Sequence, residues 1–109
     1  MNDLDAVAFQ CHSNSRDKGF WTYSHEDKTT IYLSKLALIH SEVTEVLEAI
    51  RKEKGDHEVV EEIADILIRT YDLWAAMVHD GYTKESLQAH LEAKMNKNAG
   101  RPHMHGVLA

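Results

Sequence analysis

The sequence predicts an all-α protein with four helices, and three observations support this fold class. Apolar residues recur with the 3.6-residue period of a helix over long stretches, and the β-branched residues fall within these stretches. The only proline is Pro102, so none interrupts the periodic segments before it. Glycines follow two of these segments, at Gly55 and Gly81, where helices commonly end. We therefore expect helices throughout and no β-sheet.

The first half of the chain contains two of the expected helices. The first spans about 3–15, with one apolar face formed by Leu4, Val7, Ala8 and Cys11. The segment 16–27 has the composition of a loop. The second helix spans about 28–54, and Gly55 is the expected C′ residue after it. Its apolar stripe consists of Ile39, Val43, Val46, Leu47 and Ile50.

The second half of the chain contains the other two. Asp56 is the expected N-cap of a third helix over about 57–80. Its apolar stripe consists of Val59, Ile63, Ile66, Leu67, Thr70, Trp74 and Met77. Thr83 is the expected cap of a fourth helix that continues to about residue 97, and 98–109 is expected to be irregular. Two such apolar helices in a short chain predict a central antiparallel pair, with part of its surface buried against another copy.

Charge and length exclude several classes of function. Twelve basic and eighteen acidic residues give a net charge of −6, which argues against binding to a nucleic acid polymer or an anionic membrane. No apolar stretch approaches the roughly 20 residues of a membrane span, and the acidic start lacks the apolar core of a signal peptide. Cys11 is the only cysteine, which favours a reducing compartment. We expect one cytoplasmic domain over 1–109.

Four carboxylates form two pairs with the same spacing. Glu42 and Glu45 lie in S-E-V-T-E, and Glu62 and Asp65 lie in E-I-A-D, so each pair has i, i+3 spacing on one side of a helix. Each pair flanks an apolar stripe, where an unpaired charge is costly. Carboxylate oxygens are the ligands of hard divalent cations such as Mg²⁺, Mn²⁺ and Ca²⁺.

The two acidic pairs occupy equivalent positions beside their stripes. If the two helices pair antiparallel across a short turn, both acidic pairs fall on one side of the helix pair. Charged residues with this spacing usually form a solvated helix face, and for either pair alone that interpretation would be preferred. Two matched pairs joined by a short turn favour a shared acidic cleft instead.

The pattern E-x-x-E, sixteen residues and E-x-x-D resembles the MazG-like, all-α nucleotide pyrophosphohydrolases. The resemblance extends over most of the chain. Its segments are K-G-F-W at 18–21, K-L-A-L-I-H-S-E-V-T-E at 35–45, E-E-I-A-D-I-L-I-R at 61–69 and K-M-N-K-N-A-G-R-P-H-M-H-G at 94–106. It implies a single MazG-like domain with a four-helix bundle completed by oligomerisation, as a homodimer or homotetramer with sites near subunit interfaces.

The resemblance also implies an activity. Such enzymes hydrolyse a nucleoside or deoxynucleoside triphosphate between the α and β phosphorus atoms, which gives the monophosphate and pyrophosphate. They require Mg²⁺, for which Mn²⁺ can substitute, and by resemblance the metal ligands and catalytic residues are Glu42, Glu45, Glu62 and Asp65. Metal-assisted attack by water suits these residue types, and Glu45 is the residue that we expect to orient the water.

Basic and amide side chains are the candidate phosphate contacts. Lys94 and Asn98 share a helix face, and Arg101 follows shortly after it. The alternative is the general preference of helix C-termini for cations. Lys35 and Arg69 are further candidates, and each could instead form a salt bridge with the carboxylates.

Trp21 is the candidate base contact, because it lies in a loop-like segment. Its ring could stack on a nucleotide base, or it could pack onto the helices. These two interpretations are left open by the sequence.

Two other functions compete with hydrolysis. A carboxylate-bridged di-iron bundle uses Glu-x-x-His, whereas Glu45 and Asp65 occupy the i+3 positions here. A non-catalytic helical module that binds a nucleotide or another protein is the alternative from a different class. The four intact carboxylates disfavour it without excluding it.

Overall fold

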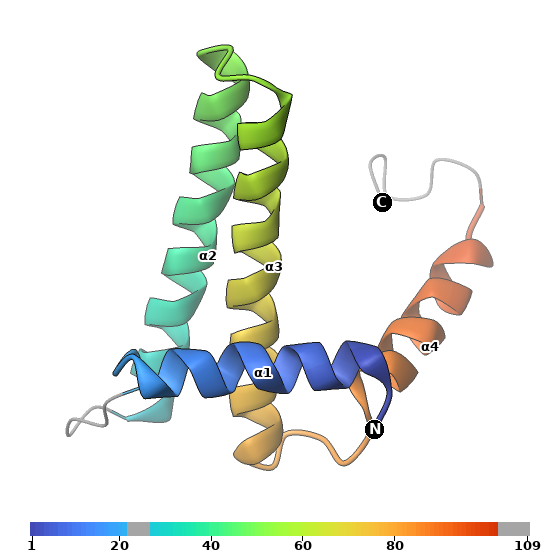
Figure 1. Ribbon diagram of the computed structural model, residues 1–109. Helices are drawn as coiled ribbons and strands as arrows, with labels where there is room; N and C mark the ends of the chain where they lie inside the picture. The colour runs from blue at the N-terminus through green and yellow to red at the C-terminus, as the bar shows by residue number, and fades with distance from the viewer. Residues whose placement is uncertain (22–26, 103–109) are drawn as a thin grey trace.

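The computed structural model describes residues 1–21 and 27–102, and this part of the protein is all-helical. The helices are α1 (Asp3–Asp17), α2 (Lys28–Arg51), α3 (Asp56–His79) and α4 (Leu87–Ala99). Helices α2 and α3 form a long antiparallel pair, α1 lies across α3, and α4 extends away from the pair (Figure 1). The predicted all-α class and central antiparallel pair are therefore confirmed. Among the described residues, no helix has the length and apolar character needed to span a membrane.

The turn between α2 and α3 differs from the prediction. Glu53, at φ 51°, takes the left-handed conformation two residues after α2 ends, so Gly55 is not the C′ residue. Gly55 is instead the N-cap of α3, with φ 101°, a conformation that favours glycine. Asp56 is the first residue of α3, and no side chain caps this helix. The predicted Asp56 cap is wrong because the glycine takes the cap position.

The start of α4 is also corrected by the structure. Thr83 does not cap this helix; Ser86 is the N-cap, and its hydroxyl accepts a hydrogen bond from the Ala89 amide at 3.0 Å. The buried Asp5 carboxylate of α1 supplies a second cap from a distant part of the chain. Its two oxygens accept from the first two amides of the helix, Leu87 at 2.8 Å and Gln88 at 3.2 Å. The start of α4 is thereby tied to α1.

Replacing Asp5 with alanine should lower the free energy of unfolding by about 1–2 kcal/mol, because a buried helix cap is lost. Burial by itself would raise the pKa of Asp5, but hydrogen bonds from Leu87, Asn2 and Gln88 outweigh it and lower the pKa below 3.8. The stabilisation is therefore complete from about pH 5 upward, well above the unfolded pKa, and is lost as the pH falls through the folded pKa. Urea unfolding at pH 7 and pH 3 measures both effects.

The matched control is Asp3→Ala, which removes an exposed carboxylate from the same first turn of α1. Asp3→Ala should lower the free energy of unfolding by only about 0.3 kcal/mol, because the exposed carboxylate stabilises α1 only through the helix dipole. Equal losses in the two variants would contradict the role of Asp5.

The core lies where the segment after α1 meets the start of α2 and the end of α3. It consists of the buried Trp21, Tyr32, Leu73 and Ala76, against which Ile31, Ile39 and Met77 pack. Much of the predicted apolar stripe on the helix pair remains outside this core. About half of each of the following side chains is exposed: Val43, Leu47, Ile50, Ile63 and Leu67. A single chain therefore leaves a large apolar surface uncovered.

Candidate functional site

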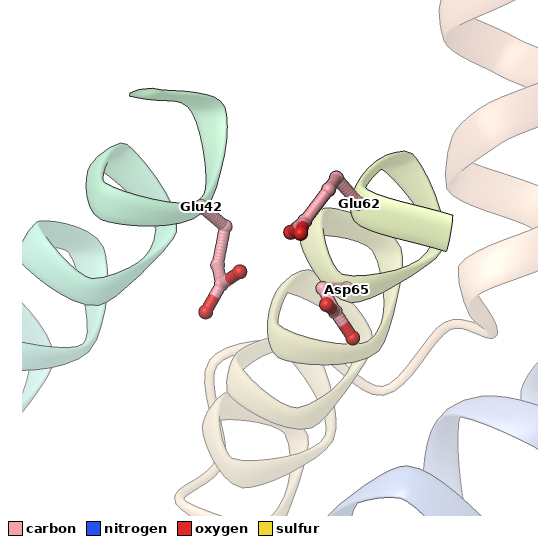
Figure 2. Close-up of side chains that lie close together, drawn as sticks. All are labelled: Glu42, Glu62 and Asp65. Carbon is pink, nitrogen blue, oxygen red and sulfur yellow. The ribbon is translucent and has the colours of Figure 1, made fainter. Parts of the chain in front are cut away.

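Three of the four predicted carboxylates lie together between α2 and α3. Glu42 extends from α2, and Glu62 and Asp65 extend from α3 into the same space (Figure 2). One carboxylate oxygen of each lies within 4.8 Å of those of the other two. The i, i+3 spacing on α3 places Glu62 and Asp65 on one side of that helix, and antiparallel pairing with α2 brings Glu42 to them. We call these three residues the acidic cluster.

Glu45 is placed differently from the other three. Its side chain is exposed and is not part of the 4.8 Å group. It is nevertheless near enough to act on Glu62, whose pKa is raised above its usual value. Partial desolvation is the largest cause, followed by the negative charges of Asp65, Glu45 and Glu42. The cluster is therefore a site of mutual repulsion that a bound cation would relieve.

Arg69 is the salt-bridge partner of the cluster. Its Nε donates a hydrogen bond to Oε1 of Glu42 at 2.7 Å. Lys35, which was predicted together with Arg69 as a phosphate contact or a salt-bridge partner, makes different contacts. Its ammonium donates to the backbone carbonyl of Phe20 and lies 4.3 Å from the centroid of the Trp21 ring. Burial lowers the pKa of Lys35, and the negative charge of Asp72 partly offsets this lowering. Lys35 thus holds the segment after α1 against α2.

A cleft of about 380 Å³ adjoins the acidic cluster. Its acidic wall includes Glu42 and Asp65, with Arg69 beside them. The cleft is also lined by Cys11, Asn14 and Ser15 of α1 and by Lys18, the C-cap residue of that helix. Their i, i+3, i+4, i+7 spacing is one sequence signal for this lining, and Lys18 also belongs to the K-G-F-W segment at 18–21. Cys11 was expected on the apolar face of this helix, and neither Asn14 nor Ser15 was predicted to lie near the carboxylates.

A buried polar network of Asp72, Trp21 and His12 adjoins the cleft, which Asp72 also lines. The Asp72 carboxylate accepts a hydrogen bond from Nε1 of Trp21 at 2.8 Å, and the same oxygen lies 2.7 Å from Nδ1 of His12. The His12 ring also meets Trp21 edge-on, with centroids 5.2 Å apart. The sequence singled out neither His12 nor Asp72, although Asp72 follows Asp65 by seven residues and so shares its helix face.

Trp21 is 6% exposed and packs in the core, as one of the two sequence interpretations expected. The ring is not among the residues that line the cleft. Base stacking on Trp21 stays a prediction, and it would require this side chain to become accessible.

The three predicted phosphate contacts at the end of the chain are not near the acidic cluster of their own chain. Lys94 and Asn98 are exposed on α4, which contacts α1 and extends away from α2 and α3 (Figure 1). Arg101 follows that helix, and none of the three lines the cleft. Their role in binding phosphate remains a prediction. The last segment of the resemblance, 94–106, also contains His103 and His105, which lie outside the described residues.

Comparison with known proteins supports the same family that the motifs suggested. Searches of curated proteins and of solved structures found no significant match. The sequence profile of the MazG nucleotide pyrophosphohydrolase domain matches residues 31–105, which include all four carboxylates and exclude α1. This match covers most of the chain, so the protein belongs to the MazG nucleotide pyrophosphohydrolase family, whose members typically depend on divalent metal ions.

Proposed function

We propose that this protein hydrolyses nucleoside or deoxynucleoside triphosphates between the α and β phosphorus atoms, with Mg²⁺ as the metal. The products would be a nucleoside monophosphate and pyrophosphate. The observation that supports this most directly is the acidic cluster, with three carboxylate oxygens within 4.8 Å in a chain of this family. The cleft beside it offers about 380 Å³ for a substrate.

The residues present suit a hard cation. All three side chains of the acidic cluster offer oxygen, the donor that Mg²⁺ and Mn²⁺ prefer. No histidine belongs to the cluster in the described residues, which disfavours the di-iron alternative. Glu42, Glu62 and Asp65 would hold the ion, which supplies Lewis-acid activation of phosphate and water. Glu45, exposed beside them, is the residue that we propose to orient the water.

The decisive experiment is product analysis. The purified protein is incubated with Mg²⁺ and a panel of nucleoside and deoxynucleoside triphosphates, and the products are separated by chromatography. Monophosphate together with pyrophosphate is the expected result. Diphosphate and phosphate would contradict the site of cleavage. Binding without turnover of any nucleotide would favour the alternative, a non-catalytic nucleotide-binding module.

Mg²⁺ should raise the melting temperature of the protein without any nucleotide. At an ion concentration about 100 times Kd, binding to the folded state adds about 2.7 kcal/mol, or several degrees for a domain of this size. Glu62→Gln should remove this shift, and it should not destabilise the metal-free protein, because it removes a charge that its neighbours repel. The control is Glu61→Gln, an exposed neighbour outside the acidic cluster. A full Mg²⁺ shift in Glu62→Gln would exclude Glu62 from the metal site.

We also propose that the protein is a cytoplasmic homodimer or homotetramer. The half-exposed apolar side chains on α2 and α3 support association, because such a surface is costly in water. Lys94, Asn98 and Arg101 belong to the proposal as phosphate contacts, and an oligomer would have to bring them to a cleft, since their own chain does not. Light scattering of the purified protein measures the oligomeric state.

A further inference from the structure

Arg69 supplies the counter-charge of the acidic cluster. In residues 1–21 and 27–102, its bond to Glu42 is the one ion pair that any of the three cluster carboxylates makes with a basic side chain. The bond is short, at 2.7 Å between Nε and Oε1, and the Glu42 side chain is only 17% exposed. Arg69 follows Asp65 by one helical turn, so its side chain extends along the same edge of α3. The guanidinium is therefore held next to the metal ligands.

Among residues 1–21 and 27–102, Arg69 uses one of its hydrogen-bond donors on another side chain. A guanidinium carries five N–H donors in a planar fork, and Glu42 takes only the one on Nε. The side chain is 37% exposed, and it lines the same cleft as Lys18, the C-cap residue of α1. The two Nη groups can donate hydrogen bonds to two oxygens of one phosphate at the same time.

The composition of the cleft shows why such a group is needed. Glu42, Asp65 and Asp72 all line it, so a polyphosphate would enter a surface of its own sign. One divalent ion at the acidic cluster offsets only part of the negative charge of three carboxylates and a polyphosphate. Arg69 and Lys18 are the two basic side chains that line the cleft in the described residues.

We propose that Arg69 is a substrate-binding residue whose guanidinium binds a phosphate of the triphosphate while its Nε holds Glu42 in place. This inference rests on the proposed function, since it assigns the phosphates to the cleft beside the acidic cluster. Arg69 thereby has two partners, a metal-binding carboxylate on one edge and the phosphate chain on the other. Lys18, which lines the same cleft just after α1, would contact the phosphate chain as well.

The test uses inorganic tripolyphosphate, a probe that contains no base or sugar, and isothermal titration calorimetry in Mg²⁺. Arg69→Gln should weaken tripolyphosphate binding by about 10-fold or more, the effect of losing a charge-assisted bidentate contact. Arg69→Lys should restore part of the affinity, because it keeps the charge but not the fork. Mg²⁺ binding without tripolyphosphate should change much less in Arg69→Gln than tripolyphosphate binding does. Loss of the bond that holds Glu42 weakens Mg²⁺ binding, whereas removal of a positive charge beside the ligands strengthens it, so the two effects offset each other. The control is Arg51→Gln, which removes an exposed arginine at the far end of α2, paired with Glu48.

Two results would overturn the proposal. Unchanged tripolyphosphate affinity in Arg69→Gln would mean that the guanidinium does not contact phosphate. Parallel loss of Mg²⁺ and tripolyphosphate binding would mean that Arg69 acts only by supporting Glu42. Failure of the proposed function has a different signature, in which the wild-type protein turns over no nucleotide even though Arg69→Gln weakens tripolyphosphate binding.

Discussion

Replacing Asp65 or Glu42 with alanine should lower nucleotide hydrolysis at least about 100-fold. Substitution of residues that only support metal ligands typically costs 10- to 100-fold in activity or affinity, so loss of a ligand should cost no less. Each residue contributes one of three oxygens that lie within 4.8 Å, and two carboxylates cannot replace the third as a donor. The measurement is kcat and KM for the nucleotide that the wild-type protein turns over best.

Folding must be checked in the same samples. The helical circular dichroism signal should be retained in both variants, because Asp65 is exposed and Glu42 bonds only to the half-exposed Arg69 in the described residues. Glu61→Ala is the matched control on α3, one residue from Glu62 but outside the acidic cluster, and it should keep wild-type activity. Wild-type rates in both Asp65→Ala and Glu42→Ala would remove these residues from the metal site.

Replacing Asp72 with alanine should lower the free energy of unfolding by about 2–4 kcal/mol, because it leaves a buried donor without an acceptor. Asp72 is 8% exposed and connects α3 to Nε1 of Trp21 and to His12. With that oxygen removed, the indole N–H of Trp21 stays buried and unpaired. Urea unfolding followed by far-UV circular dichroism measures the loss.

Asp72→Asn separates the hydrogen bond from the charge. An amide oxygen can still accept from Trp21, so this variant should lose less stability than Asp72→Ala. The exposed Asp17, at the end of α1, offers a control in which alanine should change stability by no more than about 0.5 kcal/mol. If Asp72→Ala is as stable as Asp17→Ala, the buried network does not hold the segment after α1 in place.

Periodic patterns predicted the helices well, and cap chemistry predicted their ends less well. The third helix was expected at 57–80 and is found at Asp56–His79, because its apolar repeat is long and continuous. Helix α4 was expected to begin near Thr83 and begins at Leu87. The helix begins there because Ser86 caps it and because its first two amides bond to Asp5, which lies 82 positions from Leu87. Ser86 is a local cap signal as good as Thr83, and the choice between them is favoured by the contact with Asp5, which comes from another helix and leaves no local pattern.

The buried polar groups were the least predictable part of the molecule. Asp5, His12 and Asp72 are all buried, whereas aspartate is ordinarily exposed and histidine is intermediate. Each is buried because its partner lies on a different segment, and that partner is known only once the chain has folded. For the same reason, the pairing of Lys35 with Phe20 and Trp21, rather than with the carboxylates, could not be read from spacing.

The sequence by itself determined the fold class, the antiparallel pair and the family, because these follow from apolar periodicity and from the spacing of four carboxylates within two helices. The tertiary structure decided which carboxylates meet. It brings Glu42 to Glu62 and Asp65 and leaves Glu45 exposed, since only the packing of α2 on α3 sets distances between their side chains. It also paired Arg69 with Glu42 and brought residues of α1 to line the cleft, and spacing within one helix cannot specify either contact.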